Sequence, residues 1–201
     1  MKKLLLFLLT GLVLSSLLNA QAIFKINQYN IYYNKGFMPV ATLFCNYPVS
    51  SKLSVTSYFY INAVQKTGWG EGLAGVTYTP VPGISVGLLG GLQSNEQQVF
   101  RISPIVLLNK NHFSFFGAFE FGGARYRWDC MGFYSLKSLK LGAELIRYYQ
   151  MYAAGPRVEF SFIKKQPVTI FYSALWDWKG SKLASMFGIY STFGNRWKEK
   201  G

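Results

Sequence analysis

Residues 113–121 read Phe-Ser-Phe-Phe-Gly-Ala-Phe-Glu-Phe, and this alternation decides the fold class. Successive side chains of a β-strand point to opposite faces, so one face of this segment is almost entirely aromatic. The other face carries Ser114, Phe116, Ala118 and Glu120. A period of two is typical of a strand and differs from the 3.6-residue period of a helix.

The same alternation recurs along the chain, and turn residues separate the segments. In 153–163, for example, Val158 and Phe160 oppose Arg157 and Glu159. The connections are short, which predicts one domain with an antiparallel up-and-down order. About twelve strands are expected, at 23–33, 37–47, 52–62, 68–79, 84–93, 98–108, 113–121, 124–133, 138–147, 153–163, 168–178 and 183–193.

The composition favours a membrane barrel over a soluble sandwich or barrel. Half of the residues are hydrophobic and 14% are charged, whereas soluble domains average about 25% charged residues. Strands of about ten residues also suit a tilted membrane span. We therefore predict an all-β, antiparallel up-and-down transmembrane β-barrel of about twelve strands, with ten as the lower bound. A soluble periplasmic β-barrel that binds a small ligand remains the alternative.

The N-terminus has the features of a secretory signal peptide. Met1-Lys2-Lys3 precedes an uncharged stretch from Leu4 to Leu18, which is shorter than the roughly 20 residues of a membrane-spanning helix. Small residues follow, and cleavage is expected after Ala20 or, as second choice, after Ala22. The expected organisation is a signal peptide at 1–20 and a single barrel domain at 21–201.

The segment from Met186 to Phe193 adds a resemblance. Gly188 precedes alternating apolar and aromatic residues that end in Phe193, although Ser191 departs from the pattern. This resembles the terminal assembly signal of small bacterial outer-membrane β-barrel proteins. The resemblance implies a location in the outer membrane of a Gram-negative bacterium and the barrel-assembly machinery as a partner.

A group of charged residues shares the inward face of four consecutive expected strands. Parity places five bases and six acids inside the barrel, with Arg101, Glu71 and Asp177 outside this group. Neighbouring inward residues lie about 5 Å apart, so the group is expected to form ion pairs. It either fills the lumen or lines a channel. The lumen charge network comprises Glu120, Arg125, Arg127, Asp129, Lys140, Glu144, Arg157 and Glu159.

Aromatic residues near strand ends are expected to form an interfacial girdle, comprising Tyr126, Trp128, Tyr172, Trp176 and Trp178. The net charge is +13, and the excess bases fall in turns and tails. These bases either meet lipid and lipopolysaccharide phosphates at the rims or are simply solvated. They are not arranged as a nucleic-acid patch, and the oligomeric state stays open.

Little in the sequence indicates catalysis. His112 and Ser114 resemble the His-x-Ser motif of outer-membrane lipid A deacylases, which implies an acyl hydrolase as an alternative function, but parity turns Ser114 inward. One histidine and two cysteines leave little material for a metal site, and no cofactor is expected. Cys45 and Cys130 fall on strands far apart around a barrel, so both are predicted to be free thiols. The predicted function is a non-enzymatic outer-membrane barrel that acts as a small passive pore or a structural membrane protein.

Overall fold

The computed structural model describes residues 21–30, 38–62, 68–94, 99–122, 126–148, 151–162 and 168–193. These residues contain twelve β-strands. The strands are β1 (Gln21–Asn30), β2 (Met38–Pro48), β3 (Leu53–Asn62), β4 (Trp69–Val81), β5 (Ile84–Gln93), β6 (Phe100–Lys110), β7 (Phe113–Glu120), β8 (Arg127–Leu136), β9 (Leu139–Tyr148), β10 (Met151–Ser161), β11 (Val168–Asp177) and β12 (Lys182–Phe193). The expected segments 1–20 and Arg125 lie outside the described residues.

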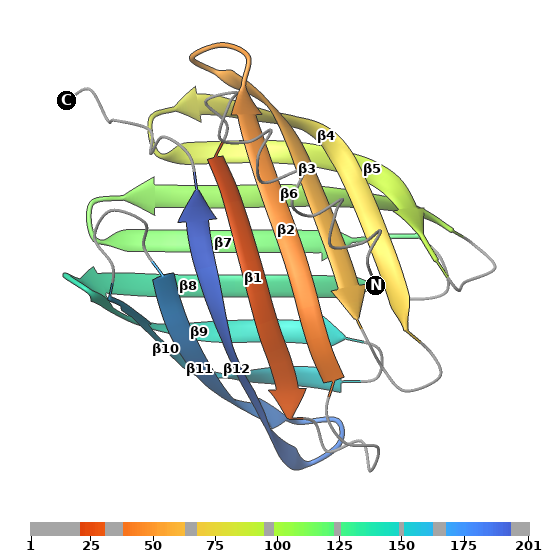
Figure 1. The fold of residues 1–201 in the computed structure, drawn as a ribbon, viewed down its shortest axis with the longest axis vertical. Coiled ribbons are helices and arrows are strands. Elements are labelled where there is room, and N and C mark those ends of the chain that lie inside the picture. The colour runs from red at the N-terminus through yellow and green to blue at the C-terminus, as the bar shows by residue number, and fades with distance from the viewer. Residues whose placement is uncertain are drawn as a thin grey trace.

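The strands form a closed barrel in which every strand pairs with its sequence neighbours (Figure 1). The ring is closed by antiparallel pairing between β1 and β12, where Ile26 lies opposite Ile189. The predicted up-and-down barrel is thus confirmed. Among the described residues there is no helix long and apolar enough to cross a membrane.

The two ends of the barrel differ in their connections. One end, here called the turn rim, carries the connections 49–52, 82–83, 111–112, 137–138 and 162–167. The opposite end, the loop rim, carries the connections that follow β1, β3, β5, β7, β9 and β11, of which four span six or seven residues. Tight turns at the turn rim use left-handed residues, with φ of 84° at Gly83 and 53° at Lys137.

Several strand boundaries were predicted two or three residues away from their positions, and the eighth strand was displaced by three residues at both ends. The sequence pattern placed a strand at 124–133, whereas β8 runs from Arg127 to Leu136. The two-residue turn at Lys137 and Ser138 is so tight that β8 and β9 remain paired up to Leu136 opposite Leu139. The left-handed backbone conformation of Lys137 makes this turn possible. Glycine is the residue that usually indicates such a conformation in a sequence, and a lysine does not.

The alternation within strands puts polar residues inside and apolar residues outside. In β3, Ser54 and Thr56 are buried, while Leu53 and Val55 are exposed. The same inversion occurs in β10, where Arg157 and Glu159 are buried and Val158 is exposed. A water-soluble barrel has the opposite arrangement, so this pattern is that of a transmembrane barrel.

Apolar side chains also occupy part of the interior. One buried cluster contains Trp69 of β4 and Met151 of β10, which are six strands apart in the ring of twelve. A second cluster joins Leu73, Leu89 and Ile105 on β4, β5 and β6. Side chains therefore fill interior space that a wide pore would leave to water.

Candidate functional site

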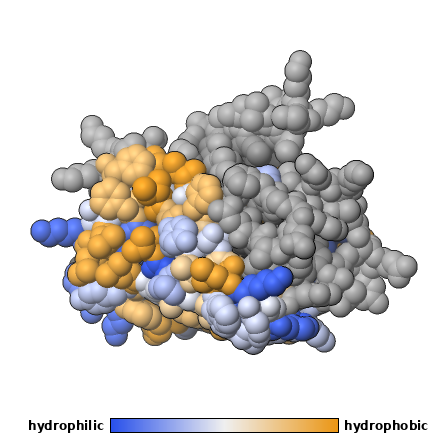
Figure 2. Space-filling model, turned by 90° about the horizontal axis from the view of Figure 1, so that it is seen from below, coloured by the Kyte–Doolittle hydropathy of each residue, from blue (hydrophilic) through white to orange (hydrophobic). Residues whose placement is uncertain are grey.

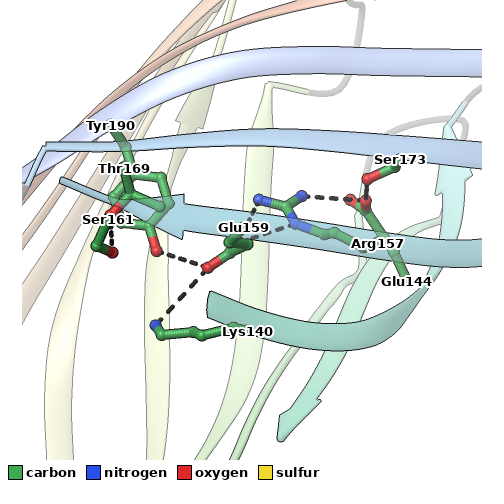
Figure 3. Close-up of polar contacts among 8 residues, drawn as sticks. All are labelled: Lys140, Glu144, Arg157, Glu159, Ser161, Thr169, Ser173 and Tyr190. Atoms are coloured by element: carbon green, nitrogen blue, oxygen red, sulfur yellow. Dashed lines mark hydrogen bonds and ion pairs between the residues drawn. The ribbon is translucent and has the colours of Figure 1, made fainter. Parts of the chain in front are cut away.

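One group of charges in the interior surrounds Arg157 on β10 (Figure 3). Its guanidinium forms ion pairs with Glu144 of β9 at 3.0 Å and with Glu159 at 2.8 Å. The Glu144 carboxylate also accepts a hydrogen bond from Ser173 at 2.6 Å, and Glu159 accepts one from Tyr190 at 2.7 Å. Four adjacent strands, β9 to β12, thus contribute to one network.

The Arg157 network is almost completely removed from solvent. The side chains of Arg157, Glu144 and Glu159 are 2%, 0% and 4% exposed, and the guanidinium lies 3.9 Å from the centre of the Phe171 ring. Lys140 is more peripheral, because its Nζ lies 3.7 Å from Glu159 and its side chain is 34% exposed. Charges in such an environment are stable only when they are paired and hydrogen-bonded.

A second network lies near the loop rim and is centred on Arg127, the first residue of β8. Its Nη2 lies 2.8 Å from Glu71 and 2.5 Å from Glu120. Its guanidinium also lies 4.5 Å from the Tyr60 ring and 5.3 Å from the Trp69 ring. Tyr60 stacks on Trp69 with 4.8 Å between ring centres.

The Arg127 network crosses the barrel. Glu71 is on β4, four strands away from Arg127 in the ring, and Tyr60 on β3 is five strands away. A side chain that bonds to strands this distant must extend through the interior rather than along the wall. Arg127 therefore obstructs the lumen close to the loop rim.

Three further charged residues that point inward, Arg101, Asp129 and Asp177, do not belong to the Arg127 and Arg157 ion pairs described above. Arg101 donates to Gln93 at 2.6 Å and to the carbonyl oxygen of Gly122. The Asp177 carboxylate accepts hydrogen bonds from the backbone N–H groups of residues 152, 179 and 180, which fixes the turn between β11 and β12. Asp129 is half-buried on β8, opposite Ala118 of β7.

The structure places six of the eight expected lumen charges in these two networks. Glu120 and Arg127 belong to one network, and Lys140, Glu144, Arg157 and Glu159 belong to the other. Sequence reasoning did not assign Glu71, Ser173 or Tyr190 to either. The alternation of its strand was a signal that Glu71 points inward. Nothing in the sequence indicates that Glu71 pairs with Arg127, which is 56 positions away.

The outer wall is apolar and carries aromatic residues at both ends. Aliphatic side chains such as Val76, Leu88 and Ile170 are exposed along the wall, and Figure 2 shows hydrophobic side chains gathered over part of the described surface. Exposed aromatic residues lie near the loop rim at Phe100, Phe121, Tyr126, Trp176 and Trp178, and near the turn rim at Tyr47, Tyr78, Phe113, Tyr134 and Phe162.

The expected girdle residues are thus mostly at one rim. Tyr126, Trp176 and Trp178 are exposed near the loop rim, and Trp128 is half-buried beside them. Tyr172 differs, because it is the fifth residue of β11 and lies at mid-wall opposite Phe187. The aromatic residues of the turn rim were missed, since their strand-end positions depend on exact strand boundaries.

The structure does not assemble a hydrolase site at His112 and Ser114. His112 is exposed in the turn after β6, and its ring contacts Tyr134 at 5.7 Å. Ser114 lies on β7 opposite Asn109 and Phe133, and no described carboxylate bonds to either residue. Among all the residues that the structure describes, no group of three or more His, Cys, Asp or Glu is placed to hold a metal ion. Cys45 and Cys130 are free thiols.

Comparisons with known proteins identify the fold. No family model matches the chain, and no curated protein matches it. Among solved structures, the KdgM porin superposes with a TM-score of 0.57 at 13% identity, covering 88% of this chain and 99% of the porin. Outer membrane phospholipase A from Escherichia coli superposes with a TM-score of 0.50 at 8% identity, covering 88% of this chain and 90% of the phospholipase. The fold is that of outer-membrane β-barrel proteins.

Proposed function

We propose that this chain is a structural outer-membrane β-barrel whose interior is closed by its own side chains. The observation that carries the proposal is Arg127, which bonds from β8 to Glu71 on β4 and so spans the lumen near the loop rim. A passive pore needs a continuous water path, and this cross-barrel ion pair lies in that path.

The outer wall supports the membrane part of the proposal. Apolar residues, most of them aliphatic, cover the middle of the wall, and exposed aromatic residues lie near both ends, which is the pattern of barrels whose wall faces lipid. The signal peptide expected at 1–20 would deliver the chain across the inner membrane. The assembly machinery and outer-membrane lipids remain the proposed partners.

The packing of the interior supports the closed state. Twelve strands enclose enough space for a cavity, yet Thr56, Met151, Ser173 and Leu175 are each 0% exposed although they point inward. Lumen side chains of an open pore would be wetted. The Arg127 and Arg157 networks, together with the apolar clusters, account for the filled interior.

The two rival functions have less support. One solved structure of the KdgM porin contains disordered oligogalacturonate, and a similar role here would require Arg127 to leave Glu71 and Glu120. A lipid hydrolase would require the His112 ring to hydrogen-bond both Ser114 and an orienting carboxylate or amide. His112 is exposed in the turn after β6, and no such bond is formed among the described residues.

The test is electrical recording of the refolded protein in planar bilayers. Insertion is first verified by heat-modifiable migration on cold SDS gels. The wild type is expected to give no steady conductance. The triple variant Arg127→Ser, Glu71→Gln, Glu120→Gln is expected to conduct measurably more than the wild type, because the contact that spans the lumen near the loop rim is removed while the Arg157 network and the apolar clusters remain. Lys110→Ser, an exposed residue at the turn rim, is the matched control and should behave as wild type. Uniform, long-lived channels in the wild type would establish a passive pore and reject the closed barrel.

A further inference from the structure

Arg147 on β9 differs from the interior arginines because it lies on the outer wall. Its cross-strand neighbours are Trp128 of β8 and Tyr152 of β10, and the adjacent residue Ile146 is buried inside. Arg127 and Arg157 each pair with two carboxylates. No described carboxylate pairs with Arg147, so its positive charge is left at the surface near the loop rim.

Three aromatic rings surround the Arg147 guanidinium. Its central carbon lies 4.7 Å from the Tyr152 ring centre, 5.0 Å from that of Trp128 and 5.5 Å from that of Tyr126. Such contacts hold a cation and restrict its rotation. The Nε of Arg147 and the indole Nε1 of Trp128 are buried and have no acceptor among the described residues, so the hydrogen-bonding capacity of this cage is not met from within it.

A second cation approaches the same cage. The Nζ of Lys179, in the turn after β11, lies 5.3 Å from the Tyr152 ring centre, so Lys179 and Arg147 are held beside one ring. The acid of that turn, Asp177, is 2% exposed and already accepts three backbone hydrogen bonds. Two cations beside one ring repel each other, and an anion bound next to them would offset this repulsion.

We propose that this rim cluster, comprising Tyr126, Trp128, Arg147, Tyr152 and Lys179, binds a phosphate group of an outer-leaflet lipid, as in lipopolysaccharide. The inference rests on the proposed membrane location. A guanidinium and an ammonium are suited to phosphate, the guanidinium through paired N–H donors. Longer connections typically face the cell exterior, which places the loop rim at the outer leaflet, where aromatic residues and lipid phosphates share the interface.

The experiment measures lipid A binding to the refolded mature protein by native mass spectrometry in a neutral detergent. The variants are Arg147→Gln, Lys179→Gln and the double variant. Arg147→Lys keeps the positive charge but loses the planar guanidinium, and it therefore separates the contribution of charge from that of stacking on the aromatic rings. Lys110→Gln removes one positive charge at the opposite rim and is the matched control. Heat-modifiable migration is recorded for each variant, so that loss of folding or insertion is distinguished from loss of lipid binding.

Each removed cation should weaken lipid A binding about fivefold, and Lys110→Gln should leave it unchanged. Dephosphorylated lipid A should bind no better to the wild type than to the double variant, and inorganic phosphate should not displace the lipid. Equal binding of phosphorylated lipid A by the wild type and the double variant would overturn the inference, as would displacement by inorganic phosphate, which would indicate a site for free anions. If even the wild type fails to fold in detergent, the proposed membrane function fails with it.

Discussion

Replacement of Arg157 by alanine is expected to be strongly destabilising, because it leaves two buried carboxylates without their cation. Arg157 pairs with Glu144 at 3.0 Å and with Glu159 at 2.8 Å, and all three side chains are at most 4% exposed. At an effective dielectric constant of about 20, each pair has a gross attraction of about 5–6 kcal/mol. The cost of removing the three charges from water offsets much of this. Loss of the central cation should therefore reduce the free energy of unfolding by about 3–5 kcal/mol.

The assay is urea-induced unfolding of the protein in lipid vesicles, followed by tryptophan fluorescence and by heat-modifiable migration. The combined variant Arg157→Met, Glu144→Gln, Glu159→Gln removes the charges together and should recover most of the lost stability, since no unpaired ion remains. Lys140→Ala is the matched control within the same network. Its pair with Glu159 is long, at 3.7 Å, and its side chain is 34% exposed, so the expected loss is below about 1 kcal/mol.

Two results would refute this reasoning. If the free energy of unfolding of Arg157→Ala is within about 1 kcal/mol of the wild-type value, Glu144 and Glu159 are hydrated, and the interior is not closed around the Arg157 network. If Lys140→Ala costs as much as Arg157→Ala, burial does not determine the strength of these pairs. Either result would also weaken the proposal that side chains fill the barrel.

Three further predictions concern other parts of the chain. Asp177→Ala removes the acceptor of two backbone N–H groups in the turn between β11 and β12 and of one on β10. It should cost about 1–3 kcal/mol in the same unfolding assay, and Asp177→Asn, which keeps one acceptor oxygen, should cost less. Cys45 and Cys130 are free thiols, so a maleimide reagent should label both after unfolding without prior reduction, and a mass two units lower that indicates a disulfide would show that the strand order is wrong. Cleavage of the signal peptide is expected after Ala20, which N-terminal sequencing of the protein from outer membranes will check; an uncleaved N-terminus would exclude this site.

Much of the fold followed from local sequence patterns. The twelve strands, the up-and-down order and the inward or outward direction of residues such as Arg157 and Val158 depend on a period of two and on short connections. Each of these signals is contained within about ten residues, so it can be read without knowledge of the rest of the chain. The errors were local as well: the boundary of β8 shifted where Lys137 adopts a left-handed turn.

The tertiary structure decided which charged residues meet and what the outer wall presents. Parity placed Glu71 and Arg127 inside, but only the curvature of the closed barrel brings β4 within reach of β8. The partners Ser173 and Tyr190, and the cage around Arg147, depend likewise on strand register and on the reach of each side chain. The sequence determined which side chains of each strand share a face, because this alternation is a property of the strand alone. Its partners depend on distances across the closed ring, which no local pattern contains.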